Sequence, residues 1–250
     1  MKFDLAKYME VKQVIFDKIK SSYECQEDKR CMVDGIIAPE IYNREKFKIA
    51  CFLGESYSYD KTGVVDIEDQ PNANILAVGR PRRHTATKIP ILLWLIFESM
   101  ERKHKISRDD FPKFLRSNDK NTKVLQCALA KSAWINVKKD TKHIDKSCKG
   151  STRQDNKEIY TRSKKNEDIL RLQIESIAPD LMIVCSNPVF NSLADMKLLG
   201  EGIERNSRLK MQKNHLGQFV IHVNHPGYLK DWGYRGIYNT FESIYDVIIQ

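Results

Sequence analysis

Three polar side chains follow runs of residues that are typical of buried strands. Glu55 comes directly after "FKIACFLG", Asn136 lies near the end of "SAWINV", and His225 follows "QFVIHVN". A carboxylate can orient or deprotonate a water molecule, and an imidazole can donate a hydrogen bond to a group that gains negative charge. An amide offers a donor and an acceptor together. Singly, the three have ordinary explanations: a loop carboxylate, a strand-end cap and a turn histidine. Together they predict a polar site.

Strands and helices alternate along the chain in a way that would position these groups. Helical periodicity covers 4–22, and "IPILLWLIF" begins an apolar helix at 89–103 that Pro90 opens. A polar loop of roughly 15–18 residues follows the strand that ends at 137. The other expected elements are strands at 47–53, 132–137 and 178–188, a loop at 60–75, helices at 108–130 (with a break near "SNDKN"), 156–177, 189–200 and 236–250, and a hairpin or single strand before 223.

This alternation predicts an α/β fold with three layers, α/β/α, around a mostly parallel central sheet of about four strands. We expect a single domain over 1–250, with an N-terminal helical segment over about 1–45. In open parallel sheets, ligands bind outside the carboxyl ends of the strands. The fold would therefore bring Glu55, Asn136 and His225 to one edge of the sheet.

The charge balance favours a polyanionic partner. The formal net charge is +9, and basic residues cluster at 79–88, 138–153 and 162–165. Any one cluster could simply be a solvated loop, but several together indicate nucleic acid. The expected DNA contacts are Arg80, Arg82, Arg83, Lys138, Lys139, Tyr228 and Arg235.

Composition argues against several other classes. The longest apolar run, 89–97, is about half the length that crosses a bilayer, and the N-terminus carries no apolar signal region. None of the six cysteines forms a CxxC pair. We therefore expect a cytoplasmic protein with reduced thiols, nucleoid-associated in a bacterium, that is monomeric, makes no membrane contact and needs neither a metal nor another cofactor.

Four motifs in order resemble the uracil-DNA glycosylase superfamily, in particular the branch whose first motif begins Gly-Glu. They are "FLGESYSYD" (52–60), "AWINVKK" (133–139), "LRLQIESIAPDLMIV" (170–184) and "VNHPGYL" (223–229). The sequence departs from that branch in three ways. Tyr57 and Ser58 stand where the first motif has Pro-Gly, Gly227 replaces the serine of His-Pro-Ser, and the iron–sulfur cysteines are absent.

The resemblance implies a monofunctional glycosylase that flips a uracil-like or otherwise modified base out of DNA and hydrolyses its N-glycosidic bond. Glu55 would activate water, and His225 would stabilise the departing base. Base-binding residues would be Asn136, Tyr57, Tyr59 and Gly54.

Two alternatives stay open. The chain could be a nucleic-acid-binding member of the same fold without glycosylase activity. It could also be an unrelated α/β enzyme that acts on a nucleotide or a phosphorylated small molecule in the strand-end crevice.

Overall fold

The computed structural model describes residues 2–23, 30–58, 63–66, 84–111, 118–143, 153–205, 208–226 and 232–248. The helices are α1 (Leu5–Tyr23), α2 (Pro39–Arg44), α4 (His84–Arg102), α6 (Asn118–Ala130), α7 (Arg153–Lys165), α8 (Glu167–Ile177), α9 (Asn187–Asp195) and α11 (Tyr234–Ile248). The strands are β1 (Arg30–Val33), β2 (Gly35–Ile36), β3 (Ile49–Ser58), β4 (Gly63–Asp66), β5 (Ser132–His143), β6 (Leu181–Cys185), β7 (Met211–Lys213) and β8 (Phe219–Val223).

Within the described ranges, all eight strands belong to one sheet, in the order β4-β1-β5-β3-β6-β8-β7, with β2 also paired to β5. The class is α/β, as predicted, but the expectation of a mostly parallel sheet of about four strands is wrong, because the sheet is larger and mixed. The strands β5, β3, β6 and β8 form a parallel centre. Short strands extend both edges. The strands β1 and β2 run antiparallel to β5, β7 runs antiparallel to β8, and β4 runs parallel to β1.

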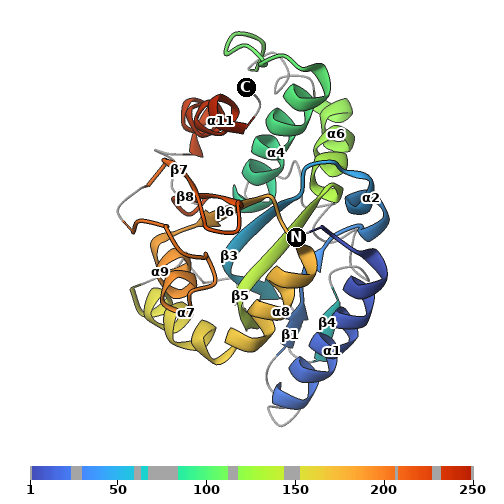
Figure 1. The fold of residues 1–250 in the computed structure, drawn as a ribbon, viewed down its shortest axis with the longest axis vertical. Coiled ribbons are helices and arrows are strands. Elements are labelled where there is room, and N and C mark those ends of the chain that lie inside the picture. Colours follow the sequence, from blue (N-terminus) through green and yellow to red (C-terminus); the bar gives the residue numbers. More distant parts are fainter. Residues whose placement is uncertain are drawn as a thin grey trace.

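Helices cover both faces of the sheet (Figure 1). On one face, α4, α6 and α11 pack over alternate residues of the parallel centre, such as Cys51, Ile183 and Ile221. On the other face, α7, α8 and α9 pack over the intervening residues, including Phe52 and Val184. A smaller apolar cluster joins α1 to β1 and α8. The period-two alternation of a strand explains why each central strand serves both layers.

The helix α4 carries the most apolar run of the chain. Ile89, Leu92, Leu93, Leu95 and Ile96 have no exposed surface, which confirms a buried helix. The helix begins at His84, five residues before the predicted start, so Pro90 lies inside it rather than in its first turn. In the part of the chain that is described, no helix is long and apolar enough to cross a membrane.

Several other boundaries differ from the sequence prediction. The single helix expected over 156–177 is two helices, because the buried Asn166 between them donates from Nδ2 to the carbonyl of Val137 on β5, 3.2 Å away. The segment 1–45 contains β1 and β2 besides helices, and the expected loop at 60–75 contains β4. The hairpin alternative before 223 is confirmed by the antiparallel pair β7 and β8.

A buried ionic network joins three parts of the fold. Asp34, between β1 and β2, accepts a hydrogen bond from Lys139 Nζ at 2.6 Å, and neither side chain has exposed surface. Gln173 of α8 donates from Nε2 to Asp34 Oδ1 at 3.0 Å and accepts from Lys139 Nζ at 2.6 Å. Burial is the main cause that lowers the pKa of Lys139, and the Asp34 carboxylate opposes it. The network fixes the connection between β1 and β2 to β5 and α8.

Removing one partner of this pair is expected to cost more than removing both. Asp34→Ala leaves the Lys139 ammonium buried without its counter-charge, which costs about 3–5 kcal/mol of unfolding free energy. The double variant Asp34→Asn/Lys139→Met removes both charges and keeps an oxygen that can accept from Asn136, so it should recover most of that loss. Urea denaturation, with the slope monitored as well as the midpoint, measures both values. Equal losses in the single and double variants would contradict this role.

Candidate active site at the carboxyl ends of the parallel strands

Glu55 lies near the carboxyl end of β3, in register with Lys138 of β5. The pairing shifts between Glu55 and Tyr57, so the strand carries an irregularity directly after the glutamate. Bulges of this kind redirect side chains and are common beside functional sites. The structure describes the backbone of Glu55 and Tyr57 but not their side chains. The backbone places Glu55 inside β3, three residues before the strand ends at Ser58, and not after a strand that stops at 53 as expected.

The ladder of the parallel centre relates Glu55 to His225. Phe52, Val184 and His222 lie at one level on β3, β6 and β8. Glu55 follows Phe52 by three residues, and His225 follows His222 by three residues. The strand β6 lies between β3 and β8 and ends at Cys185. Neighbouring strands are about 4.8 Å apart, so two strands separated by a third lie on the order of 10 Å apart. The topology therefore brings the predicted catalytic pair to the same edge.

The turn that carries His225 is held from four other segments of the chain. The carbonyl of Val223 accepts from the Ser186 N–H at 2.8 Å, and that of Asn224 from Trp232 Nε1 at 2.7 Å. Arg208 Nη1 donates to Asn224 Oδ1 at 3.2 Å. Lys88 Nζ donates to the carbonyl of Pro226 at 2.7 Å. These contacts fix the backbone on both sides of the imidazole.

Burial and a neighbouring charge keep His225 uncharged at neutral pH. The residue is half-buried, and its desolvation is the larger cause that lowers its pKa. The Lys88 ammonium is the second cause, because a nearby positive charge disfavours the imidazolium. A neutral imidazole can donate one hydrogen bond to an oxygen that becomes negative, as in enzymes that use neutral histidine as an electrophile.

Ser186 ends β6 in a strained conformation between the two catalytic candidates. Its φ of 96° and ψ of 151° lie in a region that is essentially restricted to glycine. The conformation turns the chain directly into α9, where the Phe190 N–H donates back to the Ser186 carbonyl at 3.0 Å. Strain of this type is concentrated at functional sites, which supports this edge as the site.

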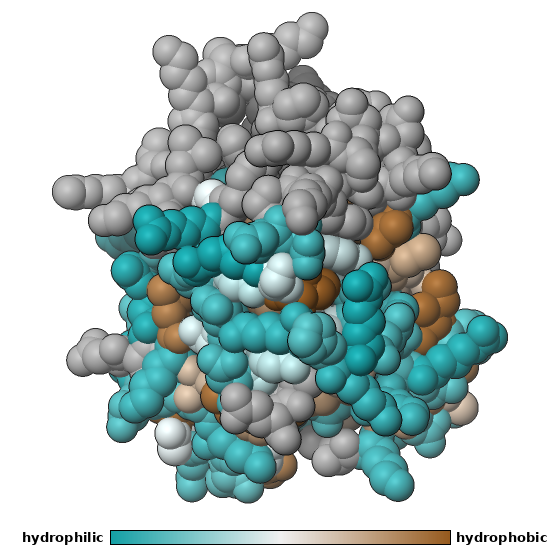
Figure 2. All heavy atoms as spheres, turned by 90° about the horizontal axis from the view of Figure 1, so that it is seen from above, coloured by the Kyte–Doolittle hydropathy of each residue, from teal (hydrophilic) through white to brown (hydrophobic). Residues whose placement is uncertain are grey.

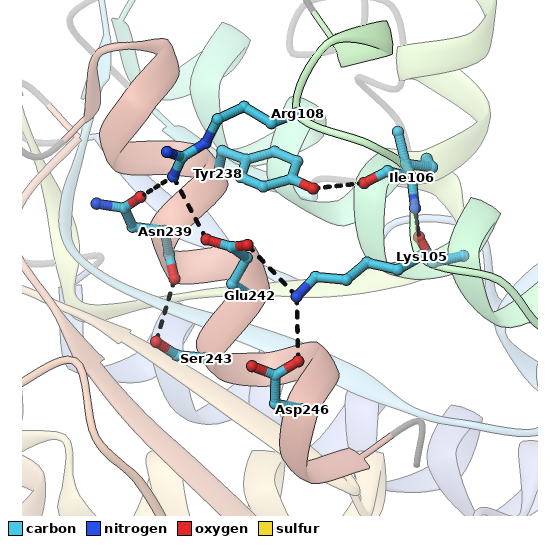
Figure 3. A network of polar contacts seen from close by, with 9 residues as sticks. Lys105, Ile106, Arg108, Tyr238, Asn239, Glu242, Ser243 and Asp246 are labelled. Carbon is cyan, nitrogen blue, oxygen red and sulfur yellow. Dashed lines mark hydrogen bonds and ion pairs between the residues drawn. The ribbon is translucent and has the colours of Figure 1, made fainter.

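The helix that follows the His225 turn is tied to the segment after α4 (Figure 3). The Tyr238 hydroxyl donates to the carbonyl of Ile106 at 2.6 Å, and Arg108 Nη2 donates to Asn239 Oδ1 at 2.6 Å. Lys105 Nζ pairs with Asp246 Oδ1 at 3.1 Å. Exposed ion pairs contribute little individually, so the buried tyrosine bond and the apolar face of α11 contribute most of the anchoring. The turn is thereby bounded by a fixed helix.

Asn136 lies inside β5, seven residues before that strand ends at His143, so the expected strand-end position is wrong, and its amide is engaged within the protein. Its side chain is buried, and Nδ2 donates to Asp34 Oδ2 at 2.9 Å. Because a carboxylate only accepts, this bond fixes which end of the amide is Nδ2 and which is Oδ1. The hydrogen bond to Asp34 therefore sets the orientation of the Asn136 amide.

Two of the predicted DNA contacts are corrected by the structure. Lys138 and Lys139 have 3% and 0% of their surface exposed. The strand β5 continues to His143, past the expected end at 137, so both lysines lie inside the sheet and its helices. Lys139 is paired with Asp34, and Lys138 Nζ lies 3.7 Å from Glu158 of α7. In this structure neither ammonium reaches a phosphate on the surface.

The other predicted residues divide into two groups. Gly54 is buried, and an added Cβ would lie 2.8 Å from Ile159 Cδ1, which gives packing against α7 as one reason for glycine there. Arg235 is exposed on the first turn of α11. Tyr59, Arg80, Arg82, Arg83 and Tyr228 lie outside the described residues.

Three further residues contribute to the site and were not predicted from the sequence: Lys88, Arg208 and Trp232. Each acts through a side-chain bond to the backbone or amide of the His225 turn. Lys88 closes the basic run 79–88, and that run was its only signal in the sequence. The other two contacts depend on tertiary proximity, for which the local sequence gives no pattern.

No protein-family model matches the chain, and no curated protein matches it. Among the residues described, no group of three or more His, Cys, Asp or Glu side chains is arranged to hold a metal ion. The family resemblance drawn from the four motifs therefore stays a prediction.

His222 is a buried imidazole close to this edge. It stacks on Phe190 with ring centroids 4.4 Å apart, and among the described residues neither ring nitrogen has a hydrogen-bond partner of normal geometry. Burial, followed by the charge of Arg208, lowers its pKa from 6.5 to about 4, and the Ser186 backbone opposes this in part. An unpaired buried imidazole is costly to the fold, and more so when it is charged.

His222 should make the fold sensitive to mild acid. Between about pH 6.5 and pH 4 the unfolded chain takes up a proton that the folded chain does not, so stability falls as pH falls, by up to about 3 kcal/mol. His222→Phe, which keeps the stacking and removes both nitrogens, should flatten this part of the curve. Urea denaturation at several pH values measures it. The lowered pKa of His225 leaves a smaller dependence of stability on pH in the His222→Phe variant. His104→Asn, at an exposed histidine, is the control. An unchanged slope in His222→Phe would contradict the assignment.

Proposed function

We propose that the chain is a DNA base glycosylase of the uracil-DNA glycosylase superfamily. Glu55 and His225 are the catalytic residues, and Asn136 reads the edge of the base. The observation that carries this proposal is the register of β3, β6 and β8, in which Glu55 and His225 each follow an aligned residue, Phe52 or His222, by three positions on either side of β6. The four motifs of the sequence support the same function independently.

The chemistry requires two groups of different character. As the bond between C1′ of the sugar and the base nitrogen breaks, its electron pair leaves with the base, and the sugar becomes oxocarbenium-like. Glu55 orients a water molecule toward C1′ and accepts its proton as the new C–O bond forms. His225 donates a hydrogen bond to the carbonyl oxygen on which the base anion concentrates its charge. The lowered pKa of His225 suits this role, because the donor is then a neutral imidazole at neutral pH.

The net charge of +9 supports DNA as the substrate class, because a basic protein attracts phosphates irrespective of sequence. On the face that Figure 2 shows, the coloured side chains are mainly hydrophilic, with smaller hydrophobic areas among them. A surface of this kind suits a partner held by charge and hydrogen bonds more than one held by an apolar patch. Arg235 on this proposal contacts a phosphate.

A second function, binding nucleic acid without cleavage, is favoured by one observation. The buried Asn136 already donates to Asp34, and Lys138 and Lys139 are buried, so part of the expected base and phosphate contacts is engaged within the protein. A site that holds a flipped base without reacting would tolerate these internal contacts. Catalysis therefore has to be separated from binding by experiment.

Glu55→Gln and His225→Ala should abolish cleavage while DNA binding persists. Labelled oligonucleotides carrying uracil, hypoxanthine, xanthine, hydroxymethylcytosine or a glucosylated derivative are incubated with the protein, and alkali then cuts at abasic sites. Loss of general base or anion stabilisation lowers the rate by about 100-fold or more. Affinity for the same oligonucleotides, measured at several salt concentrations, should change little and should fall steeply with salt.

The exposed residues Glu175 and His104 supply matched controls, since Glu175→Gln and His104→Ala make the same chemical changes away from the site. Salt-sensitive binding without cleavage of any substrate would favour the binding function. If neither binding nor cleavage occurs, the remaining alternative is an α/β enzyme for a smaller nucleotide-like substrate.

A further inference from the structure

Lys88 occupies an unusual position for a lysine. It lies in the second turn of α4, is half-buried, and its Nζ donates to the carbonyl of Pro226 at 2.7 Å. Desolvation lowers its pKa. Lysine side chains usually keep the ammonium in water and bury only the stem. Here the ammonium is instead directed at the backbone next to His225.

The contact joins two segments that are far apart in the sequence. The turn 224–226 follows β8, whereas α4 precedes β5 in the chain. Trp232 and Arg208 hold the turn at Asn224, on the amino side of His225. Lys88 holds it at Pro226, on the carboxyl side.

We propose that Lys88 is a positioning residue for His225, whose bond to Pro226 fixes the turn so that the imidazole meets the carbonyl of the departing base. This inference rests on the proposed glycosylase function and assigns a role that the four sequence motifs do not contain. The same ammonium disfavours a second positive charge on the imidazole, so it sets both the place and the charge state of the hydrogen-bond donor.

Other charged groups lie on the elements around the turn. They are Arg208 before β7, Arg235 on α11 and Glu55 on β3. Arg208 donates to Asn224, and its charge acts on His222. Lys88 is the charge that lowers the pKa of His225. An effect of Lys88 on His225 is therefore separable from the effects of the other two cations by substitution at one position.

A phosphate contact is the competing role, because Lys88 ends the basic run 79–88. The two roles differ in kinetics. Loss of a phosphate contact that is made equally in the ground state and the transition state raises KM and leaves kcat unchanged. A misplaced catalytic group lowers kcat, and a displacement of about 1 Å can cost on the order of 100-fold.

The test compares Lys88→Met, which keeps the stem but removes the charge and the donor, with Lys88→Arg, which keeps both. On the substrate that wild type cleaves, Lys88→Met should lower kcat by about tenfold to 100-fold with KM changed by less than about threefold. Lys88→Arg should retain most of the activity. Lys157→Met, at an exposed lysine on α7, is the control. A raised KM with unchanged kcat would overturn the proposal in favour of a phosphate contact.

A second readout does not depend on cleavage. The titration of the His225 ring protons is followed by NMR, with His225→Ala used to assign the signals. The pKa of His225 should rise in Lys88→Met and stay near the wild-type value in Lys88→Arg, because only the first variant removes the positive charge. An unchanged His225 titration in Lys88→Met would overturn the electrostatic coupling between Lys88 and His225. Absence of cleavage by wild type, with the shift present, would instead reject the glycosylase function and keep the electrostatic coupling.

Discussion

The buried pair of Asp34 and Lys139 is the constraint on which the assembly of β1, β2, β5 and α8 depends. The side chain of Lys139 has no exposed surface, and such an ammonium is tolerated only when its counter-charge and its remaining donors are satisfied. Asp34 provides the counter-charge and accepts one hydrogen bond, and Gln173 accepts a second. These residues come from the β1–β2 connection, from β5 and from α8, so the three elements have to assemble together. A slip of β5 by one residue would turn Lys139 to the other face and leave Asp34 buried without it.

The same carboxylate also determines part of the candidate site. Asp34 Oδ2 accepts from the backbone N–H and from Nδ2 of Asn136, at 2.5 Å and 2.9 Å. The amide that would read a base is therefore oriented by the group that neutralises Lys139. Structural and functional demands meet at one residue. Changes that weaken the core network would alter the edge of the sheet that carries the site, without a change in any residue that contacts a ligand.

The sequence predicted the elements whose signals are local. Apolar runs marked β3, β5, β6 and β8, and helical periodicity marked α1, α4 and α11, so the placement of His225 just after a strand followed from pattern and class. The strand β3 runs on to Ser58, so Glu55 lies inside it and not after its end. The burial of Lys138 and Lys139 could not be predicted in this way. A basic run at the end of a strand normally lies in solvent, and only distant partners, Asp34 and Gln173, make burial of Lys139 possible. The strands β1, β2 and β4 were missed because they are short and carry little alternation.

The His225 turn illustrates why a catalytic group benefits from many weak restraints. Each hydrogen bond to the turn contributes only about 1 kcal/mol to stability, and the loss of one would leave the fold intact. Their value lies in direction, since bonds to Val223, Asn224 and Pro226 arrive from different elements and leave the backbone little freedom. A donor fixed in this manner needs no reorganisation when charge develops on the leaving group. Rigid placement, which depends on tertiary contacts, is therefore the part of the site that distinguishes a catalytic histidine from an ordinary turn residue.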